Sequence, residues 1–271
     1  MGYRSLLITL VVLMAFVASQ IEAQQFVTDG LVSFWSFDNS SMSGNITEDV
    51  WGNNDGEMID TQVVAGKFNE GLEFNGSTSL VSIPNDPSFD IFDALTLEAW
   101  IKLRVWAVAD RHSIMTRYDT GEPKRYAQFA IRPDASLSVF LGHSDGTAYI
   151  EGSIGAETPE WEGEWVHVVA SWAMSDGGLP KLYVNGAEVA YGTQSPWEDT
   201  LATNNDLPWI IGAYPGRDRF LDGVIDEVRI YSKRLSDAEV MTNFSVQSNV
   251  VSAVQPADKL ATTWADVKLD W

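Results

Sequence analysis

The sequence contains no cysteine and has few basic residues. Without cysteine, no disulfide can stabilise the fold, and no thiol can serve as a nucleophile or as a site for a lipid anchor. Lys and Arg number 17 against 38 Asp and Glu, which gives a net charge of -21. Such a chain cannot neutralise a phosphate backbone, so nucleic acid is excluded as a partner, and an anionic membrane surface is disfavoured. The excess of carboxylates suits solubility and cation binding.

Long apolar runs are also scarce, and the one clear example lies at the N-terminus. Arg4 precedes an apolar run over residues 6–18, and Ile21-Glu22-Ala23 follows as a small-residue cleavage pattern. Residues 1–23 are therefore predicted to be a signal peptide that is removed after export, with an uncleaved anchor as the alternative. We expect a secreted protein, extracellular or periplasmic, that has no membrane association after cleavage.

The pattern in the rest of the chain predicts short β-strands. Apolar and polar residues alternate in three clear segments, which are 95–103 (LTLEAWIKL), 164–173 (EWVHVVASWA) and 181–191 (KLYVNGAEVAY). The pairs Asn185-Gly186 and Asp145-Gly146 separate short runs and predict tight hairpins, because both turn positions need positive φ. No helical periodicity of useful length precedes Ser236. The pattern predicts an all-β fold, an antiparallel two-sheet jelly-roll sandwich with short C-terminal helices.

The C-terminal part carries the two helical signals. Ser236 and Glu239 have capping-box spacing and predict the start of one short helix. The polar stretch 242–258 reads as a linker. After it, four apolar residues share one helical face: Leu260, Trp264, Val267 and Trp271. We expect a folded domain over residues 24–245 and a tail over 246–271, whose helix docks on the domain or binds a partner.

The segment 220–231 (FLDGVIDEVRIY) raises a question about one carboxylate. Strict alternation places Val224, Asp226, Val228 and Ile230 on one face, which looks buried. Burying a carboxylate without a partner is very unfavourable. Asp226 must therefore have ligands or hydrogen-bond donors that the local pattern does not reveal.

The order of short motifs resembles the laminin-G-like jelly roll of the concanavalin A-like lectin/glucanase superfamily. The motifs extend over about residues 26–245, and they are, in order, WSFD (35–38), DVWGNNDG (49–56), GKFNEGLEFNG (66–76), SIP (82–84), LTLEAWIK (95–102), WVHV (165–168), LYVNG (182–186) and the segment that contains Asp226. Each motif is weak alone, but their order is specific for the fold. It says less about function, which depends on sites built on the fold.

The resemblance implies a structural calcium ion near the edge of the sandwich. The expected ligands are Asp38, Asp49 and Asp226, with Asn53 or Asn54 as a further candidate, since calcium takes carboxylate and amide oxygens. The alternative is that Asp226 accepts backbone N–H bonds from a neighbouring turn, and that Asp49 and Asp55 shape an Asx turn.

The same resemblance favours a non-catalytic recognition module that binds a glycan or an extracellular protein. Trp106, Trp161 and Trp197 lie in polar, loop-like stretches, where an exposed ring beside carboxylates suits a sugar face. Each ring could instead anchor its loop.

Two other function classes were weighed. A glycoside hydrolase needs a pair of carboxylates, which the glucanases of this superfamily carry as E-x-D-x-E on one strand, and this chain has no such triplet. His167 lies in a strand pattern that favours a packed histidine over a base. We therefore expect no enzymatic activity. A structural or adhesive component of a cell-surface assembly remains the alternative to a lectin-like module.

Overall fold

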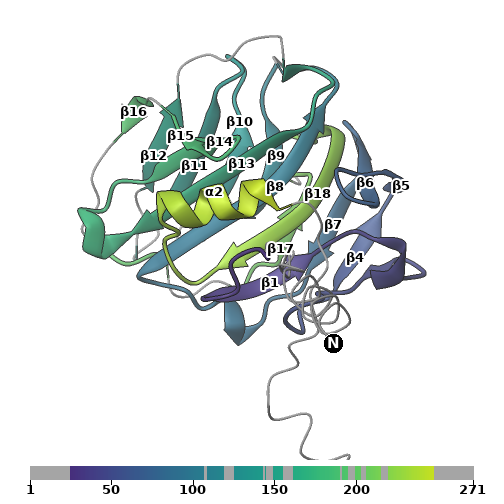
Figure 1. The fold of residues 1–271 in the computed structure, drawn as a ribbon, viewed down its shortest axis with the longest axis horizontal. Coiled ribbons are helices and arrows are strands. Elements are labelled where there is room, and N and C mark those ends of the chain that lie inside the picture. Colours follow the sequence, from purple (N-terminus) through teal and green to yellow (C-terminus); the bar gives the residue numbers. More distant parts are fainter. Residues whose placement is uncertain are drawn as a thin grey trace, which may run out of the picture.

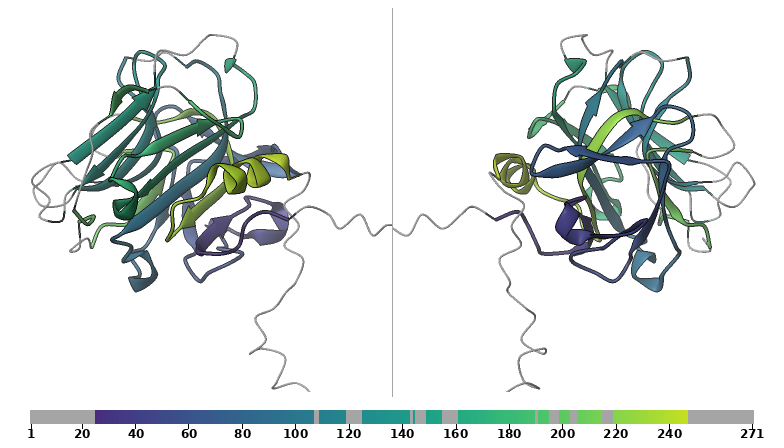
Figure 2. Two further views of the ribbon diagram at one scale, coloured as in Figure 1. Left: turned by 60° about the vertical axis from the view of Figure 1, so that its left-hand side comes forward. Right: turned by 90° about the vertical axis from the view of Figure 1, so that its right-hand side faces the viewer.

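The computed structural model describes residues 25–106, 109–118, 125–142, 144, 149–154, 161–189, 191–194, 199–202, 206–214 and 219–246, with the backbone alone at 125, 149–154 and 191–194. These residues form two antiparallel sheets that face each other, with one α-helix lying across the outside of one of them (Figure 1, Figure 2). The predicted two-sheet β-sandwich is confirmed. The predicted signal peptide, Trp197 and the C-terminal helix lie outside the described residues.

The sheet that carries the helix is called sheet A. Its strand order is β15 (Ala187–Glu188), β14 (Lys181–Val184), β13 (Val166–Ala173), β8 (Ala94–Leu103), β18 (Asp222–Tyr231), β6 (Glu70–Asn75) and β5 (Gln62–Ala65), and β1 (Leu31–Trp35) also pairs with β18.

The opposite sheet is called sheet B. Its order is β16 (Tyr191–Gln194), β12 (Tyr149–Ile154), β11 (Leu137–Gly142), β10 (Arg125–Ile131), β9 (His112–Tyr118), β17 (Trp209–Ile211), β7 (Leu80–Ile83), β4 (Gly56–Ile59), β3 (Ile46–Thr47) and β2 (Met42–Ser43). Three short 3-10 helices occur among the described residues, namely η1 (Asn39–Ser41), η2 (Pro87–Phe89) and η4 (Met174–Asp176).

The core between the sheets follows the alternation expected for β8. Leu95, Leu97 and Ile101 are all buried in it. The alternate residues Thr96 and Glu98 are equally buried, yet they belong to the outer face of sheet A. That face is therefore covered, and a second apolar cluster over it includes Phe26, Tyr183, Leu235 and Val240. Sheet A thus has buried apolar side chains on its outer face as well as on its inner face.

Strand β18 departs from strict alternation, and this corrects the expected face of Asp226. Glu227 has a φ of 56°, and the pairing with β8 shifts between Asp226 and Arg229. This bulge inserts one residue, so Ile225 and Val228 both point into the core, where alternation would place only one of them. Asp226 consequently does not share a face with Val228. Asp226 pairs with Trp100 on β8, the strand that also carries Glu98.

Helix α2 (Asp237–Ser245) begins with the predicted capping box between Ser236 and Glu239. It continues through Ser245, so residues 242–245, expected as the start of a linker, are helical. The ring of Phe244 stacks on Trp100, with a centroid distance of 5.7 Å and an interplanar angle of 23°. This packing is the reason why the linker expectation was wrong at these positions.

The predicted hairpin at Asn185-Gly186 is confirmed and it also makes room for α2. Asn185 and Gly186 have φ values of 50° and 81° between β14 and β15. A Cβ at position 186 would lie 2.8 Å from the Phe244 ring, so glycine serves both the turn and the helix contact. Strands β11 and β12 pair as a second hairpin, although its expected turn at 145–146 lies outside the described residues. Among the helices that are described, none has the length and apolar character needed to cross a membrane.

Candidate functional site

A pocket of about 430 Å³ opens at the N-terminal end of α2, and we call it the α2 pocket. Three separate segments form it: η4, strand β14, and the chain that leads into α2. Its lining residues are Asp176, Lys181, Tyr183, Arg234, Leu235, Ser236, Asp237 and Ala238. The walls are therefore provided by a sheet and by a capped helix, which are rigid supports for binding groups.

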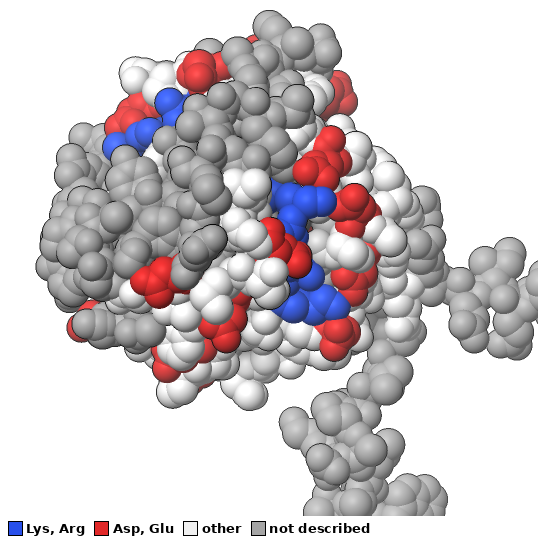
Figure 3. Space-filling view, turned by 90° about the vertical axis from the view of Figure 1, so that its left-hand side faces the viewer, with Lys and Arg blue, Asp and Glu red and all other residues white. Residues whose placement is uncertain are grey.

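The charged groups of the α2 pocket are paired with one another. Lys181 Nζ lies 3.2 Å from Asp237 Oδ1 and 2.8 Å from Glu188 Oε2. The Tyr183 hydroxyl donates to the same Asp237 oxygen at 2.8 Å. Arg234 Nη1 lies 3.3 Å from Asp176 Oδ2. On the side of the molecule that Figure 3 shows, the visible Lys and Arg side chains likewise lie against Asp and Glu side chains.

These contacts and burial shift the pKa values of Asp237, Lys181 and Tyr183 further from pH 7. The Tyr183 hydroxyl and then Lys181 hold the pKa of Asp237 below its ordinary value. The hydrogen bond to Glu188, with a further one to Asp237, raises the pKa of Lys181. Burial raises the pKa of Tyr183. At neutral pH Asp237 and Lys181 are therefore ionised and Tyr183 is neutral, so all three act as fixed donors and acceptors.

A second group of charges lies under the C-terminal half of α2, and we call it the Glu98 cluster: Glu98, His167, Arg229, Tyr231 and Asn243. All five residues are at least 98 % buried. The Glu98 carboxylate accepts from His167 Nε2 at 2.9 Å, from Arg229 Nη1 at 3.1 Å and from Asn243 Nδ2 at 2.7 Å. Although burial opposes ionisation, these partners hold the pKa of Glu98 below its ordinary value. The packed histidine expected in β13 is confirmed.

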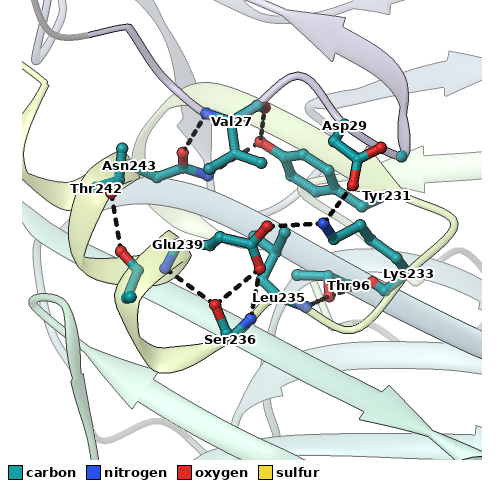
Figure 4. A network of polar contacts seen from close by, with 12 residues as sticks. Val27, Asp29, Thr96, Tyr231, Lys233, Leu235, Ser236, Glu239, Thr242 and Asn243 are labelled. Atoms are coloured by element: carbon teal, nitrogen blue, oxygen red, sulfur yellow. Dashed lines mark hydrogen bonds and ion pairs between the residues drawn. The ribbon is translucent and has the colours of Figure 1, made fainter.

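Two members of the Glu98 cluster, Tyr231 and Asn243, connect α2 to the first described residues of the chain through Val27 (Figure 4). Asn243 accepts from Val27 N at 2.7 Å and donates to the Tyr231 hydroxyl at 3.0 Å. The Tyr231 hydroxyl in turn donates to Val27 O at 3.0 Å. The Arg229 guanidinium lies between the rings of Phe26 and Phe34, at 4.4 and 4.3 Å from their centroids. The cluster thus joins both ends of the described chain to the centre of sheet A.

Asp226 has hydrogen-bond donors from a turn that is distant in the sequence. Its Oδ2 accepts from Lys67 N at 2.8 Å and Phe68 N at 3.0 Å, and its Oδ1 accepts from Glu227 N at 2.8 Å. Gly66 allows this approach, since a Cβ there would lie 2.6 Å from Asp226 Oδ2. Burial, and then the charge of Glu227, raise the pKa of Asp226 to about 8 against these three donors. These contacts match the hydrogen-bonding alternative of the sequence analysis.

Asp49 is engaged in the same way, in a different loop. Its Oδ1 accepts from the backbone N–H of Phe34, Trp51 and Gly52 at 2.9, 3.1 and 2.9 Å, and its Oδ2 accepts from Asn54 N at 3.2 Å. Asp55 Oδ1 accepts from Asp49 N at 2.9 Å. A carboxylate with this many backbone donors organises the loop.

The other two expected calcium ligands are Asp38 and Asn53. Asp38 Oδ1 lies 3.5 Å from Glu70 N, in the turn that also binds Asp226. Asn53 is exposed. Its neighbour Asn54 is buried and donates to the hydroxyls of Ser33 and Ser88 at 2.8 and 3.0 Å. The structure thus brings Asp38 and Asp226 to one turn and leaves the two asparagines in the Asp49 loop.

The arrangement of these side chains does not fit a calcium ion. The carboxylates of Asp49 and Asp226 are used by backbone N–H groups, whereas calcium needs 6–8 oxygen ligands. Within the described part of the chain, no group of three or more His, Asp and Glu side chains is arranged to hold a metal. Calcium binding stays a prediction that metal removal can test.

Of the three expected ligand-binding tryptophans, the structure describes Trp106 and Trp161, and their rings do not form an exposed surface. Trp106 is 1 % exposed, and its ring packs edge-to-face on Trp161 with centroids 5.2 Å apart. Trp161 is half-buried against the core. Trp197 lies outside the described residues. The geometry of Trp106 and Trp161 is that of loop anchors.

Sequence reasoning missed the residues of the α2 pocket. Asp176, Lys181 and Arg234 come from three segments that have no motif in common, and ion pairs between distant segments leave no local pattern. The signal that was available is the Ser236–Glu239 capping box, which locates the start of α2 but not its neighbours.

Comparison with known families identifies the class of protein. The family model described as the concanavalin A-like lectin/glucanases superfamily matches residues 75–241. The match covers more than half of the sequence, and the chain belongs to this family. The resemblance drawn from the motifs is confirmed. A search of curated proteins found no match.

Solved structures share the fold at low sequence identity. The binding domain of Paraclostridial Mosquitocidal Protein 1 aligns with a TM-score of 0.62 and 17% identity, over 80% of this chain and 52% of that one. The binding domain of botulinum neurotoxin DC, solved in complex with SialylT, aligns with a TM-score of 0.60 and 12% identity, over 80% and 51% of the two chains. This chain thus spans about half the length of the toxin domains.

A third structure matches almost a whole domain. Domain 4 of AbnA, an extracellular GH43 arabinanase from Geobacillus stearothermophilus, was solved in complex with arabinotriose. It aligns with a TM-score of 0.57 and 22% identity, over 78% of this chain and 96% of that domain. At these identities the comparisons show a shared fold.

Proposed function

We propose that the protein is a secreted, non-catalytic recognition module that binds a carbohydrate or an extracellular protein at the α2 pocket. The observation that carries this proposal is the mutual pairing of the pocket's charged groups. Lys181, Tyr183 and Asp237 hold one another in place before any ligand arrives. Preorganised donors and acceptors of this kind favour binding, because little side-chain entropy is lost when a ligand engages them.

The protonation states of the pocket support recognition over hydrolysis. Glycoside hydrolysis by two carboxylates needs one that is protonated and one that is ionised at working pH. The pKa of Asp237 is lowered, so this carboxylate stays ionised. The pKa of Lys181 is raised, so this ammonium keeps its proton. General acid–base catalysis works best with groups whose pKa lies near the working pH, and these two shifts move in the opposite sense.

The comparisons support a glycan ligand. An arabinotriose complex is known for the arabinanase domain, of which this chain matches nearly the full length, and a SialylT complex is known for a toxin binding domain. Those ligands belong to those proteins. For this chain they favour a carbohydrate over an extracellular protein as the ligand. Export is supported by the signal-peptide pattern at residues 1–23.

A glycan array tests the proposal most economically. The mature protein, residues 24–271, is applied with calcium and with EDTA. We expect binding to a defined set of glycans and no release of reducing sugar from a panel of polysaccharides. If no glycan binds in either condition and a specific surface protein is captured, only the protein-binding function remains. Hydrolysis above background would overturn the non-catalytic assignment.

A further inference from the structure

We infer that the α2 pocket selects a neutral saccharide and discriminates against acidic glycans. This inference rests on the proposed recognition function and names the ligand class for the same site. The glycans bound by the compared structures fall into both classes, since arabinotriose is neutral and a sialylated glycan carries a carboxylate. The charges of the pocket decide between them.

The lining of the pocket is electrically balanced. Two basic residues, Lys181 and Arg234, face two acidic residues, Asp176 and Asp237. Each cation is paired with a lining carboxylate, and Lys181 has a second carboxylate in Glu188. No cation of the lining is left over for an anionic ligand. An acidic sugar would bring its carboxylate close to Asp176 and Asp237, which would face it as like charges.

The same groups keep hydrogen-bonding capacity that hydroxyl groups can use. Asp237 accepts both Tyr183 and Lys181 through Oδ1, which leaves the lone pairs of Oδ2 for a ligand hydroxyl. Arg234 Nη1 approaches Asp176 without forming a hydrogen bond, so this donor has no hydrogen-bond partner. A hydroxyl can donate to the first group and accept from the second. Sugar hydroxyls do both without bringing a charge.

The size and surroundings of the pocket agree with this ligand class. A volume of about 430 Å³ lies at the lower end of the range for small-molecule sites and suits one or two sugar residues. Leu235 and Ala238 add an apolar portion to the lining, against which the C–H face of a sugar can rest. The net charge of -21 on the whole chain also repels acidic glycans before contact.

The test is an array of neutral glycans, each printed beside its sialylated counterpart. Wild-type protein should bind neutral members and should bind their sialylated forms at least about tenfold more weakly. The double variant Asp176→Asn/Asp237→Asn removes both lining carboxylates, so Arg234 loses its ion pair with Asp176 and Lys181 keeps only its ion pair with Glu188. It should lose about tenfold in affinity for the neutral glycans. It should also bind sialylated forms better than the wild type does.

The control variant carries the same change of charge away from the pocket. Glu57→Gln/Asp60→Asn alters two exposed residues at β4 of sheet B and should leave both affinities unchanged. Thermal unfolding of each variant establishes that it is folded before binding is compared.

The possible outcomes separate the inference from the proposed function. If the wild type binds neutral glycans and the pocket variant binds them equally well, the pocket assignment is wrong and the recognition function stands. Preferential binding of acidic glycans by the wild type overturns the inferred ligand class. If the wild type binds no glycan, the carbohydrate function fails, and the inference fails with it.

Discussion

Two groups of charged residues lie on the outer face of sheet A, at opposite ends of the same helix, and they differ in almost every physical respect. The Glu98 cluster is buried, and its members come from β8, β13, β18 and α2. The α2 pocket is open, and the side chains of Lys181 and Asp237 are 29% and 67% exposed.

The difference in exposure predicts a difference in role. Buried charges without their partners are strongly unfavourable, whereas exposed ion pairs contribute little to stability. The Glu98 cluster should therefore determine whether the protein folds, and the α2 pocket should determine what it binds. Substitutions in the Glu98 cluster should lower stability. Substitutions in the α2 pocket should lower ligand affinity with little loss of stability.

The largest expected loss of stability comes from Glu98→Gln. The variant leaves the buried Arg229 guanidinium and the His167 ring beside a neutral amide. We expect a decrease of about 3–5 kcal/mol in the free energy of unfolding, measured by urea denaturation. Glu73→Gln is the matched control, because Glu73 is partly exposed and pairs with the exposed Arg104. Equal effects of the two substitutions would contradict the contrast between buried and exposed charges.

Asp226→Asn should have the next largest effect. Above about pH 8, where Asp226 is ionised, one of its two oxygens becomes an NH₂ group that faces backbone N–H donors, so we expect a loss of about 1–3 kcal/mol there. If the carboxylate is purely a hydrogen-bond acceptor, the loss is the same with calcium and with EDTA, and EDTA leaves the wild-type melting temperature unchanged. If EDTA destabilises the wild type but not the variant, Asp226 binds calcium after all.

Because the pKa of Asp226 is raised, the difference in stability between wild type and Asp226→Asn should depend on pH. The folded state holds this proton up to about pH 8, whereas the unfolded chain releases it near its ordinary pKa of 3.8. Between these values the folded state binds more protons, so its stability falls as the pH rises. Urea denaturation from about pH 5 to about pH 8 should show a steeper decline for wild type than for Asp226→Asn. Parallel profiles would mean that Asp226 is ionised throughout this range.

Asn243→Ala should have an intermediate effect, because it removes the connection from α2 to Glu98, Tyr231 and Val27. We expect a loss of about 1–2 kcal/mol and faster amide hydrogen exchange within α2. Thr242→Ala is the neighbouring control, since Thr242 is partly exposed and its hydroxyl bonds within the helix. A variant that exchanges no faster than this control would show that α2 is held by its apolar contacts alone.

Lys181→Met should have the smallest effect on stability. Its ion pairs with Glu188 and Asp237 are exposed, so the loss should be below about 1 kcal/mol. The substitution nevertheless removes the cation that holds Asp237 in the pocket, and ligand affinity should fall. Thermal unfolding and glycan binding measured on the same preparation check both parts. A stability loss as large as that of Asn243→Ala would place Lys181 in the structural group.

Local sequence patterns predicted those elements whose cause is local. Alternation identified β8 and its two faces, and Asn185-Gly186 identified the hairpin between β14 and β15. Alternation failed in β18, because one positive φ at Glu227 changes the face of every residue after it. The donors to Asp226 were equally hidden, since Lys67 and Phe68 precede it by 159 and 158 residues.

The candidate site was less predictable than the fold. The α2 pocket depends on ion pairs between segments that only the folded chain brings together, such as Asp176 with Arg234 and Lys181 with Asp237. The polar stretch around Trp106 did not indicate that its ring is buried.

Binding of a neutral saccharide at the α2 pocket can be measured by comparing the affinities of two proteins. Isothermal titration calorimetry is performed with a neutral glycan selected from the array, on wild type and on Asp176→Asn/Asp237→Asn. We expect about a tenfold loss of affinity in the variant, with an unchanged melting temperature and a gain for the sialylated form of the same glycan. Identical affinities of the two proteins for the neutral glycan would contradict this expectation.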